Sequence, residues 1–566
     1  MHAKTSVLLI KYVLFPIFYM LSLVSHAQGG LKNVSHTLDS IFHHYDQGNQ
    51  PGLSIAILEK NKPVTLKSYG MANLEYNTKL TPHSLFNAAQ LSQQFTVFSI
   101  LFLQEKGKLS IDDDVKKHLP ELKEWPHEIK LHHLMEQTSG LRDVAELIKW
   151  KGYTSGDVVT KQEILKLIKN QKTLNFNPGS KVEYNWSGYV LLTEIIERLS
   201  GVSFPEFVDK HIFTPLEMDN SMFSDDHRMV IPNRSYSYKK EGNAHYKVSN
   251  NSSFVGGSNL YTSASDFAKW LENMSLKKIG HPSFYSYLFT NTILSDGNKT
   301  DYTPGIYRDN RSGYWTIHYE GLDHGFSSYM MHIPEHDFSL VYFSNSADIS
   351  GGELYETIYD WFHKDYEILP QAQNPAQEVT YISKSKQELE MCIGHYLLEE
   401  NFSLRKIVME NDTLFYERNE NNKVPMVPIE GNLTFKMIIP NNDKVRVSFL
   451  DSGQTLEYRF INTGEKSDFV THGRKLKTLR NEQSEVSGQF KNEVLNQVIK
   501  IDITDHTAQV TMGETIVNLE HIGDDEFLAP PNSTVRLLKL NRDQQQRVTG
   551  AYLSGWRIKN LYYSKN

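Results

Sequence analysis

The spacing of hydrophobic residues changes along this chain, which predicts regions of different architecture. Residues 31–369 mix buried-strand segments with segments whose apolar residues recur at helical spacing. Residues 444–450 instead alternate, with valine or phenylalanine at every second position, as in a strand with one solvated face. Similar short segments recur to the C-terminus, and none predicts a long helix. The patterns therefore predict one α+β domain followed by an all-β region.

Within the first region, several elements can be placed from apolar runs and stop signals. A Pro-Gly turn precedes the first buried strand, and the apolar segment that follows it is predicted to be its hairpin partner. Two amphipathic segments end at a glycine, which is a helix stop signal. The predicted strands are 53–58, 64–69 and 339–344, and the predicted helices are 95–106, 189–199 and 354–363.

A polar stretch that contains proline, residues 370–386, predicts a linker between the two regions. Beyond it, 394–396 (GHY) is echoed by 488–490 (GQF), and 406–408 (KIV) by 500–502 (KID), both at a spacing of 94 residues. Two matches at one spacing indicate a duplicated unit. Because a closed sheet leaves no unpaired edge, we expect two small antiparallel β-barrels, at residues 387–480 and 484–566.

Composition narrows the classes of function. The 566 residues are 39% hydrophobic and 22% charged, which is enough for several cores. The net charge of −8, without long runs of one sign, argues against a nucleic-acid partner. A single cysteine, Cys392, excludes an intramolecular disulfide. Cys392 lies at the start of the first predicted barrel, far in sequence from the motifs described below.

The N-terminus predicts export. Two lysines precede an apolar run at 12–24, which ends in Ser25-His26-Ala27 with small residues where a signal peptidase cleaves. We therefore expect residues 1–27 to be a signal peptide cleaved after Ala27. The run is shorter than a membrane span of about 20 residues and contains Pro16, which argues against an uncleaved anchor. No later stretch is long and apolar enough to span a bilayer, so we expect a periplasmic or secreted protein.

A series of motifs in the first region resembles the serine β-lactamases and penicillin-binding-protein-like hydrolases, in particular the class C, D-aminopeptidase and esterase branch. In chain order these motifs are 86–96 (FNAAQLSQQFT), 134–141 (LMEQTSGL), 178–180 (PGS), 188–192 (GYVLL), Gly256-Gly257 and 325–328 (GFSS). The resemblance implies an antiparallel sheet flanked by helices, with a helical subdomain. The tail resembles the lipocalin-like barrels that some of these hydrolases carry.

The catalytic motif of that family, SxxK, is degenerate in this chain. The family pattern places Gln90 at the position of the nucleophilic serine and Gln93 at that of the lysine. Gln90 has no hydroxyl with which to form an acyl-enzyme, and Gln93 has no titratable amine to accept a proton. Ser92 is the nearest serine, but two residues along a helix is a rotation of about 200°, which turns it away from that face.

The other two motifs of the family are also incomplete. In the second, Tyr184 survives as a candidate base or proton relay, and Trp186 replaces the asparagine. In the third, Tyr319 stands where a histidine or lysine is expected, two residues before Gly321. His318 would fit only with a one-residue slip that misplaces Gly321. The sequence contains no recognisable metal-ligand spacing or phosphate loop, so we expect neither a metal nor a cofactor.

Three hypotheses about function follow. The first is a pseudo-hydrolase whose cleft binds a peptide, a cell-wall-like fragment or a protein partner that the sequence does not identify. In it, the backbone N–H of Gln90 can still contribute to an anion-binding hole. The second is an active peptidase, esterase or amidase that uses Tyr184 with an unrecognised nucleophile or water. The third makes the barrels a scaffold at the cell surface, and the D-aminopeptidase resemblance equally implies a lid or wall for the cleft.

Overall fold

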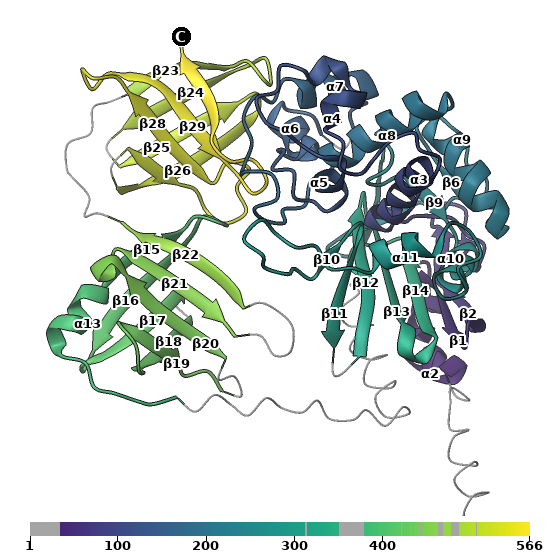
Figure 1. Cartoon of the computed structure of the whole chain (residues 1–566), viewed down its shortest axis with the longest axis horizontal. Helices are drawn as coiled ribbons and strands as arrows, with labels where there is room; N and C mark the ends of the chain where they lie inside the picture. The colour runs from purple at the N-terminus through teal and green to yellow at the C-terminus, as the bar shows by residue number, and fades with distance from the viewer. Residues whose placement is uncertain are drawn as a thin grey trace, which may run out of the picture.

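A computed structural model of the chain places a mixed domain beside two barrels (Figure 1). The structure describes residues 34–566 apart from 155, 312–313, 350–378, 420–421, 441–443, 462–467, 477–485, 505 and 524. The predicted signal peptide, the helix predicted at 354–363 and most of the predicted linker lie outside these described residues.

The first domain is built on an antiparallel sheet of seven strands. In spatial order the strands are β10 (Tyr302–Thr303), β11 (Ile306–Arg311), β12 (Tyr314–Asp323), β13 (Phe326–Ile333), β14 (Phe338–Ser344), β1 (Leu53–Glu59) and β2 (Lys62–Tyr69). Every residue of β13 and β14 is buried, because helices cover both faces of the sheet. The pairing of β11 with β12 ends at His318, so none of the described strands lies beside the last residues of β12 on that side.

Helices cover the two faces unequally. On one face, α2 (Val34–Phe42) packs its apolar side against β1. On the other lie α10 (Ala264–Leu276) and α3 (Gln93–Glu105), and α3 also packs against α8 (Ser187–Ser200). The other α-helices in the described part of this domain are α4 (Val115–His118), α5 (Leu131–Met135), α6 (Val144–Trp150), α7 (Lys161–Lys169), α9 (Phe204–Val208) and α11 (Pro282–Leu288).

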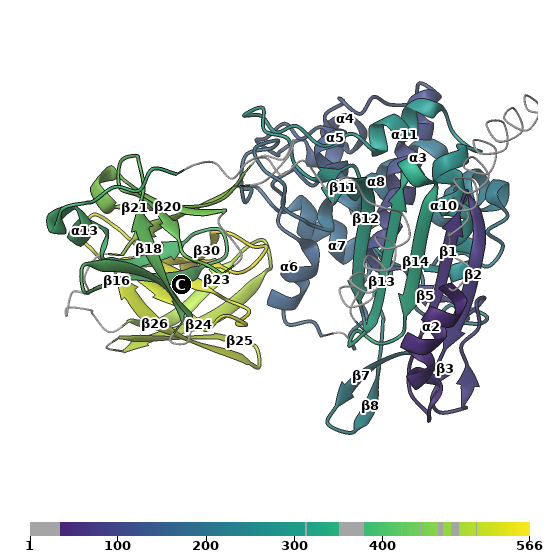
Figure 2. The same ribbon diagram turned by 90° about the horizontal axis from the view of Figure 1, so that it is seen from below.

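Short strands complete the first domain. They form three small sheets, and one of these is a hairpin that projects from the domain (Figure 2). The hairpin is β7 (Ser237–Glu241) with β8 (Ala244–Val248), and the other strands are β3 (Met71–Asn73), β4 (Thr78–Lys79), β5 (Phe86–Asn87), β6 (Met222–Phe223) and β9 (Leu260–Thr262).

The elements predicted from hydrophobic spacing in the described part of this domain are confirmed. The strands predicted at 53–58, 64–69 and 339–344 correspond to β1, β2 and β14, and the helices predicted at 95–106 and 189–199 correspond to α3 and α8. Helix α3 begins earlier than predicted, at Gln93. Gln93 and Gln94 are fully buried, so the helix starts with polar residues that carry no hydrophobic signal.

The all-β region forms two closed antiparallel barrels, as predicted. Barrel 1 consists of β15 (Gly394–Leu398), β16 (Ser403–Glu410), β17 (Thr413–Asn419), β18 (Asn422–Pro428), β19 (Thr434–Met437), β20 (Val445–Leu450), β21 (Thr455–Phe460) and β22 (Phe469–Lys475). Barrel 2 consists of β23 (Val486–Asn492), β24 (Gln497–Thr504), β25 (Thr507–Met512), β26 (Thr515–Gly523), β27 (Glu526–Leu528), β28 (Leu537–Arg542), β29 (Val548–Ser554) and β30 (Leu561–Lys565).

A short helix, α13 (Lys386–Cys392), precedes barrel 1 and packs against it. A capping box between Ser385 and Glu388 begins the helix. Cys392 ends the helix in the barrel core, where burial raises the pKa of its thiol to about 12. The thiol therefore stays protonated and unreactive at neutral pH.

Barrel 2 is joined to the first domain by the connection between β29 and β30, residues 555–560, which we call the hub loop. Side chains of the first domain hold the hub loop in place by hydrogen bonds to its backbone. The guanidinium of Arg142, only 1% exposed, donates to the carbonyl of Lys559 from Nε at 3.2 Å and from Nη2 at 2.8 Å. Asn175 donates to the carbonyl of Arg557 at 3.1 Å and accepts from the N–H of Lys559 at 2.8 Å.

An ion pair strengthens the same interface. The guanidinium of Arg557 contacts the carboxylate of Asp143, whose side chain is fully buried, and lies 3.3 Å from a carboxylate oxygen of Glu146. Next to it, a Cβ at Gly555 would lie 2.8 Å from the indole of Trp150, so only glycine allows this approach. One continuous hydrophobic cluster accordingly runs from the first domain into barrel 2, whereas the interior of barrel 1 forms a separate cluster.

Barrel 1 contacts barrel 2 through a small apolar cluster that includes Leu397, Phe402 and Leu537. Lys559 of the hub loop reaches this contact as well. Its Nζ donates to the carbonyl of Glu400 at 2.8 Å and lies 4.1 Å from the ring centroid of Phe402. The hub loop therefore touches all three parts of the chain.

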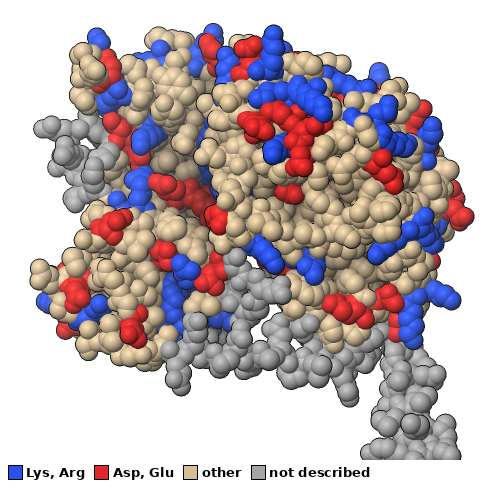
Figure 3. All heavy atoms as spheres, in the orientation of Figure 1, with Lys and Arg blue, Asp and Glu red and all other residues tan. Residues whose placement is uncertain are grey.

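Charges on the surface are mixed. On the face drawn in Figure 3, acidic and basic side chains alternate in small groups across the first domain and both barrels. None of the helices described is long and apolar enough to cross a membrane.

Replacing Arg557 with alanine should destabilise the protein by about 3 kcal/mol or more, because it leaves the buried Asp143 carboxylate without its partner. Thermal and urea unfolding would measure the loss. The matched control is Arg547→Ala, which removes an exposed arginine of barrel 2 and should cost about 0.5 kcal/mol or less. Equal losses in the two variants would contradict the role assigned to the ion pair.

The hub loop should also make stability depend on pH. Burial lowers the pKa of Lys559 to about 8 from its ordinary value of 10.5. Since the unfolded chain then binds more protons than the folded one between these values, the free energy of unfolding should rise as the pH increases from about 8 to 10.5. The rise amounts to roughly 3 kcal/mol at 1.36 kcal/mol per pKa unit. Lys559→Met should lack this rise, and parallel pH profiles for the two proteins would refute it.

Candidate functional site

The site predicted from the sequence begins at a tight turn that leads into α3. The turn, η2 (Ala89–Ser92), packs directly on the last residues of β12, on the side where β11 no longer pairs with them. A Cβ at Gly321 would lie 2.9 Å from both the carbonyl oxygen of Ala88 and the Cβ of Ala89, which explains the glycine of the third motif. Ala89 itself has a positive φ of 49°, and Asn87 accepts a hydrogen bond from its N–H at 2.9 Å. Such strained backbone is maintained only where the surroundings enforce it.

The side chain of Gln90 pairs with the backbone of β12. Its Oε1 accepts a hydrogen bond from the N–H of Leu322 at 2.7 Å, and its Nε2 donates to the carbonyl of Leu322 at 3.4 Å. These backbone groups are accessible because β11 no longer pairs with β12 beyond His318. The carboxamide of Gln90 therefore takes the place that a neighbouring peptide group would occupy.

Gln93 lies at the centre of the site and is fully buried. Its Oε1 accepts hydrogen bonds from the hydroxyls of Tyr302 at 3.1 Å and Tyr319 at 3.0 Å. With the oxygen held by two donors, the amide nitrogen is oriented toward Tyr184 and donates to its hydroxyl at 3.3 Å. The amide thus links the first turn of α3 with two strands of the sheet and with the segment before α8.

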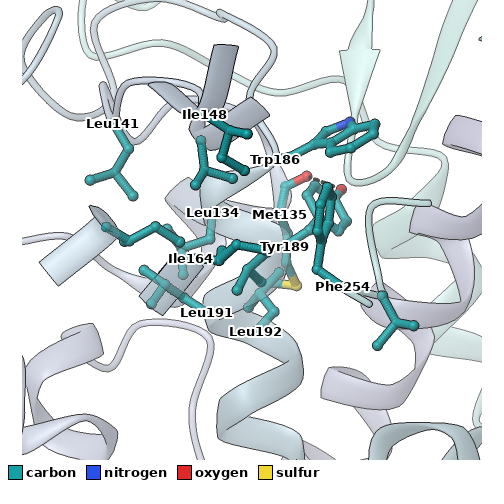
Figure 4. Close-up of a cluster of buried hydrophobic side chains, with 14 of the residues drawn as sticks. Leu134, Met135, Leu141, Ile148, Ile164, Trp186, Tyr189, Leu191, Leu192 and Phe254 are labelled. Carbon is teal, nitrogen blue, oxygen red and sulfur yellow. Dashed lines mark hydrogen bonds between the residues drawn. The ribbon is translucent and has the colours of Figure 1, made fainter. Parts of the chain in front are cut away.

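Tyr184 receives a second hydrogen bond from the indole N–H of Trp186. The indole is held in turn by Phe254, with ring centroids 4.9 Å apart, next to the hydrophobic cluster around Tyr189 (Figure 4). Because both donors point at the oxygen of Tyr184, its own hydroxyl proton is directed away from them. Half-buried Tyr184 can therefore donate to a group outside this network.

The hub loop of barrel 2 forms one side of the site. The guanidinium carbon of Arg557 lies 5.1 Å from the ring centroid of Tyr184, within cation–π distance. Burial raises the pKa of Tyr184 well above its ordinary value, and Arg557 offsets only part of this effect. Burial also raises the pKa values of Tyr302 and Tyr319. All three phenols are therefore neutral at neutral pH, and none is poised to act as a general base.

The structure brings together Gln90, Gln93, Tyr184, Trp186 and Tyr319, and it places Gly321 beside them in the packing contact described above. The side chain of His318 has other partners, with Nε2 3.4 Å from Asp309 and the ring stacked on Tyr307. Ser92 is fully buried, and its Oγ accepts a hydrogen bond from the N–H of Leu260 at 3.3 Å. Asn185, next to Trp186, donates to Gln137 at 3.2 Å and accepts a hydrogen bond from the N–H of Gly188, in the first turn of α8, at 3.0 Å.

Three parts of the site were not predicted from the sequence. Tyr302 comes from the two-residue strand β10, and Arg557 from a loop in another domain. Leu322 contributes only its backbone, which no side-chain motif can reveal. Within the described residues, no group of three or more histidine, cysteine, aspartate or glutamate side chains could hold a metal ion.

The sheet, the helical lobe and the motif positions define a β-lactamase/transpeptidase-like domain. A family model described as Beta-lactamase matches residues 38–360, more than half of the chain, and the protein therefore belongs to this family.

The protein is similar to D-aminopeptidase of Gluconobacter oxydans (strain 621H), with 27% identity over 308 residues, 54% of this chain and 58% of that one. The chain thus spans less than two thirds of that relative. It is 25% identical to penicillin-binding protein 4* of Bacillus subtilis (strain 168) over 413 residues, 68% of this chain and 88% of that one. The crystal structure of a penicillin-binding protein from Bacillus halodurans matches with a TM-score of 0.50 and 22% identity, covering 59% of this chain and all of that one.

Replacing Gln93 with leucine should destabilise the first domain by about 2 to 4 kcal/mol, since it leaves the buried hydroxyls of Tyr302 and Tyr319 without their acceptor. Tyr302→Phe is the control: it removes one donor while Gln93 keeps the other, and it should cost about 1 kcal/mol. Urea unfolding would compare the two variants. A Gln93→Leu variant as stable as the parent would show that the network is dispensable.

Proposed function

We propose that this protein is a non-catalytic member of the Beta-lactamase family whose site binds a peptide or a cell-wall-like fragment without turning it over. The observation that carries the proposal is that glutamine amides occupy the two positions of SxxK and are engaged by the protein's own groups, Gln90 by Leu322 and Gln93 by three tyrosines. The site is therefore organised around neutral hydrogen-bonding groups.

The chemistry of the family requires a nucleophile and a group that accepts its proton. In a serine protease, loss of the nucleophile alone costs on the order of a millionfold in rate, or about 8 kcal/mol of barrier. Here Gln90 supplies no nucleophile, Gln93 cannot take up a proton, and burial keeps Tyr184 neutral. To catalyse the family's reaction, this protein would need a nucleophile and a proton acceptor from residues outside these positions.

The remaining polar groups favour ligands that contain amides or carboxylates. A ligand oxygen can replace Oε1 of Gln90 at the N–H of Leu322, and the hydroxyl of Tyr184 can donate a second hydrogen bond. Trp186, whose indole N–H donates to Tyr184, packs against Phe254 directly behind this hydroxyl and keeps it in place. The family names of the relatives, D-aminopeptidase and penicillin-binding protein, support peptides of the cell-wall type as candidates. Such a role is consistent with the export expected from the N-terminal sequence.

Incubation with a fluorophosphonate and with a labelled penicillin, followed by intact mass spectrometry, tests the proposal. We expect no covalent adduct with the natural protein. An adduct on any serine of the first domain would favour an active hydrolase instead. Titration of acetyl-D-alanyl-D-alanine with tryptophan fluorescence tests binding, with Trp186→Phe as the control that should lose the signal. Absence of both adduct and binding would contradict the proposed ligand class.

A further inference from the structure

The inner face of barrel 1 carries two arginines at one end. In β16 and β17 the inward positions are marked by buried Ile407 and Tyr416, which are 0% and 1% exposed. Arg405 and Arg418 lie two residues from them, on the same face of their strands. Lys406 pairs with Glu417 in the register of the two strands, so the two arginines occupy neighbouring positions. Arg405 is half-buried and Arg418 is exposed at the mouth of the barrel.

Tyrosine hydroxyls accept hydrogen bonds from both arginines. Nε of Arg405 donates to the hydroxyl of Tyr416 at 3.0 Å, and Nη2 of Arg418 donates to that of Tyr458 at 3.3 Å. The two rings are themselves 6.0 Å apart. Burial raises the pKa of Tyr416, and both guanidinium groups, which place two positive charges around this phenol, oppose the effect. Each hydroxyl oxygen is used as an acceptor and keeps its proton for donation.

Within the part of barrel 1 that the structure describes, no carboxylate forms an ion pair with Arg405 or Arg418. The acidic residues on β16 and β17, Glu410 and Glu417, pair instead with lysines on the outer face. Two like charges at neighbouring positions of a sheet destabilise it unless a counter-charge lies between them. The arrangement therefore favours an anion at the mouth of the barrel.

Barrel 2 provides an internal comparison. The pair Lys406–Glu417 in barrel 1 corresponds to Lys500–Thr511 in barrel 2, which preserves the 94-residue spacing in three dimensions. The positions equivalent to Arg405, Tyr416 and Arg418 are Ile499, Val510 and Met512, all buried with at most 3% exposure. In barrel 2, apolar side chains fill these inner positions. The barrel fold therefore does not require arginines at them.

We propose that the mouth of barrel 1 is a binding site for an oxyanion, a carboxylate or a phosphate, held between the guanidinium groups of Arg405 and Arg418 with the hydroxyls of Tyr416 and Tyr458 as further donors. Guanidinium groups match the planar geometry of such anions and bind them by paired hydrogen bonds. Partly buried Val424, the strand partner of Tyr416, and Phe460, two residues from Tyr458 on the same strand, also pack in the barrel interior and supply an apolar surface for any tail that the anion carries.

Isothermal titration of the whole protein with inorganic phosphate, acetate and decanoate tests the site and separates a free anion from an amphiphile. Arg405→Ile and Arg418→Met, which install the residues of barrel 2, should each weaken binding at least tenfold. Lys406→Gln removes an adjacent charge from the outer face and should leave binding unchanged. Tighter binding of decanoate than of acetate would identify an amphiphile, and equal binding a free anion. Binding of none of these anions, or equal loss in all three variants, would overturn the proposal.

Thermal unfolding without ligand provides a second measurement. If the two arginines repel each other in the empty site, Arg405→Ile and Arg418→Met should raise the melting temperature, and added phosphate or decanoate should stabilise the natural protein but not the variants. A lower melting temperature in both variants would show that the arginines are satisfied within the chain, and the proposal would fail. Neither result depends on whether the site in the first domain binds a ligand.

Discussion

The amide of Gln93 is the contact on which the site of the first domain depends, because one buried group joins two strands of the sheet to the first turn of α3 and to the segment before α8. Its oxygen fixes Tyr302 and Tyr319 of the sheet, and its nitrogen fixes Tyr184 of the helical lobe. A buried amide is stabilising only when both of its ends are paired, and here the paired ends lie on different lobes. Gln93 thereby acts as a structural connection between the sheet and the helical lobe.

The need to pair both ends of a side-chain amide also explains the turn beside Gln93. Gln90 pairs with both backbone groups of Leu322 where the sheet leaves them unpaired, and Gly321 allows the turn to approach closely enough for this pairing. The positive φ of Ala89 is the conformational cost of that approach. In this protein the strained turn positions a carboxamide that pairs with the backbone of β12 beyond the last residue that β11 pairs with.

Much of the fold and part of the site could be predicted from the sequence, for different physical reasons. Buried strands such as β1 and β14, and the duplicated barrels, follow from hydrophobic spacing and repetition, which are local properties. The convergence of Gln90, Gln93, Tyr184 and Tyr319 required family motifs to set their register. Tyr302 and Arg557 could not be predicted, because their roles depend on tertiary contacts: a two-residue strand and a loop from another domain carry no local pattern that marks them.

The two barrels show how one architecture can carry different chemistry. Their strands keep the same register at a spacing of 94 residues, yet the inner positions of β24 and β25 are apolar where β16 and β17 carry arginine and tyrosine. Barrel 2 instead interacts through its hub loop, which pairs with the buried Arg142 and Asp143 of the first domain. Because that loop also forms one side of the site at Tyr184, barrel 2 belongs structurally to the first domain. Barrel 1, with its separate core, is the part of the chain in which an independent binding function can be accommodated at little cost to the rest.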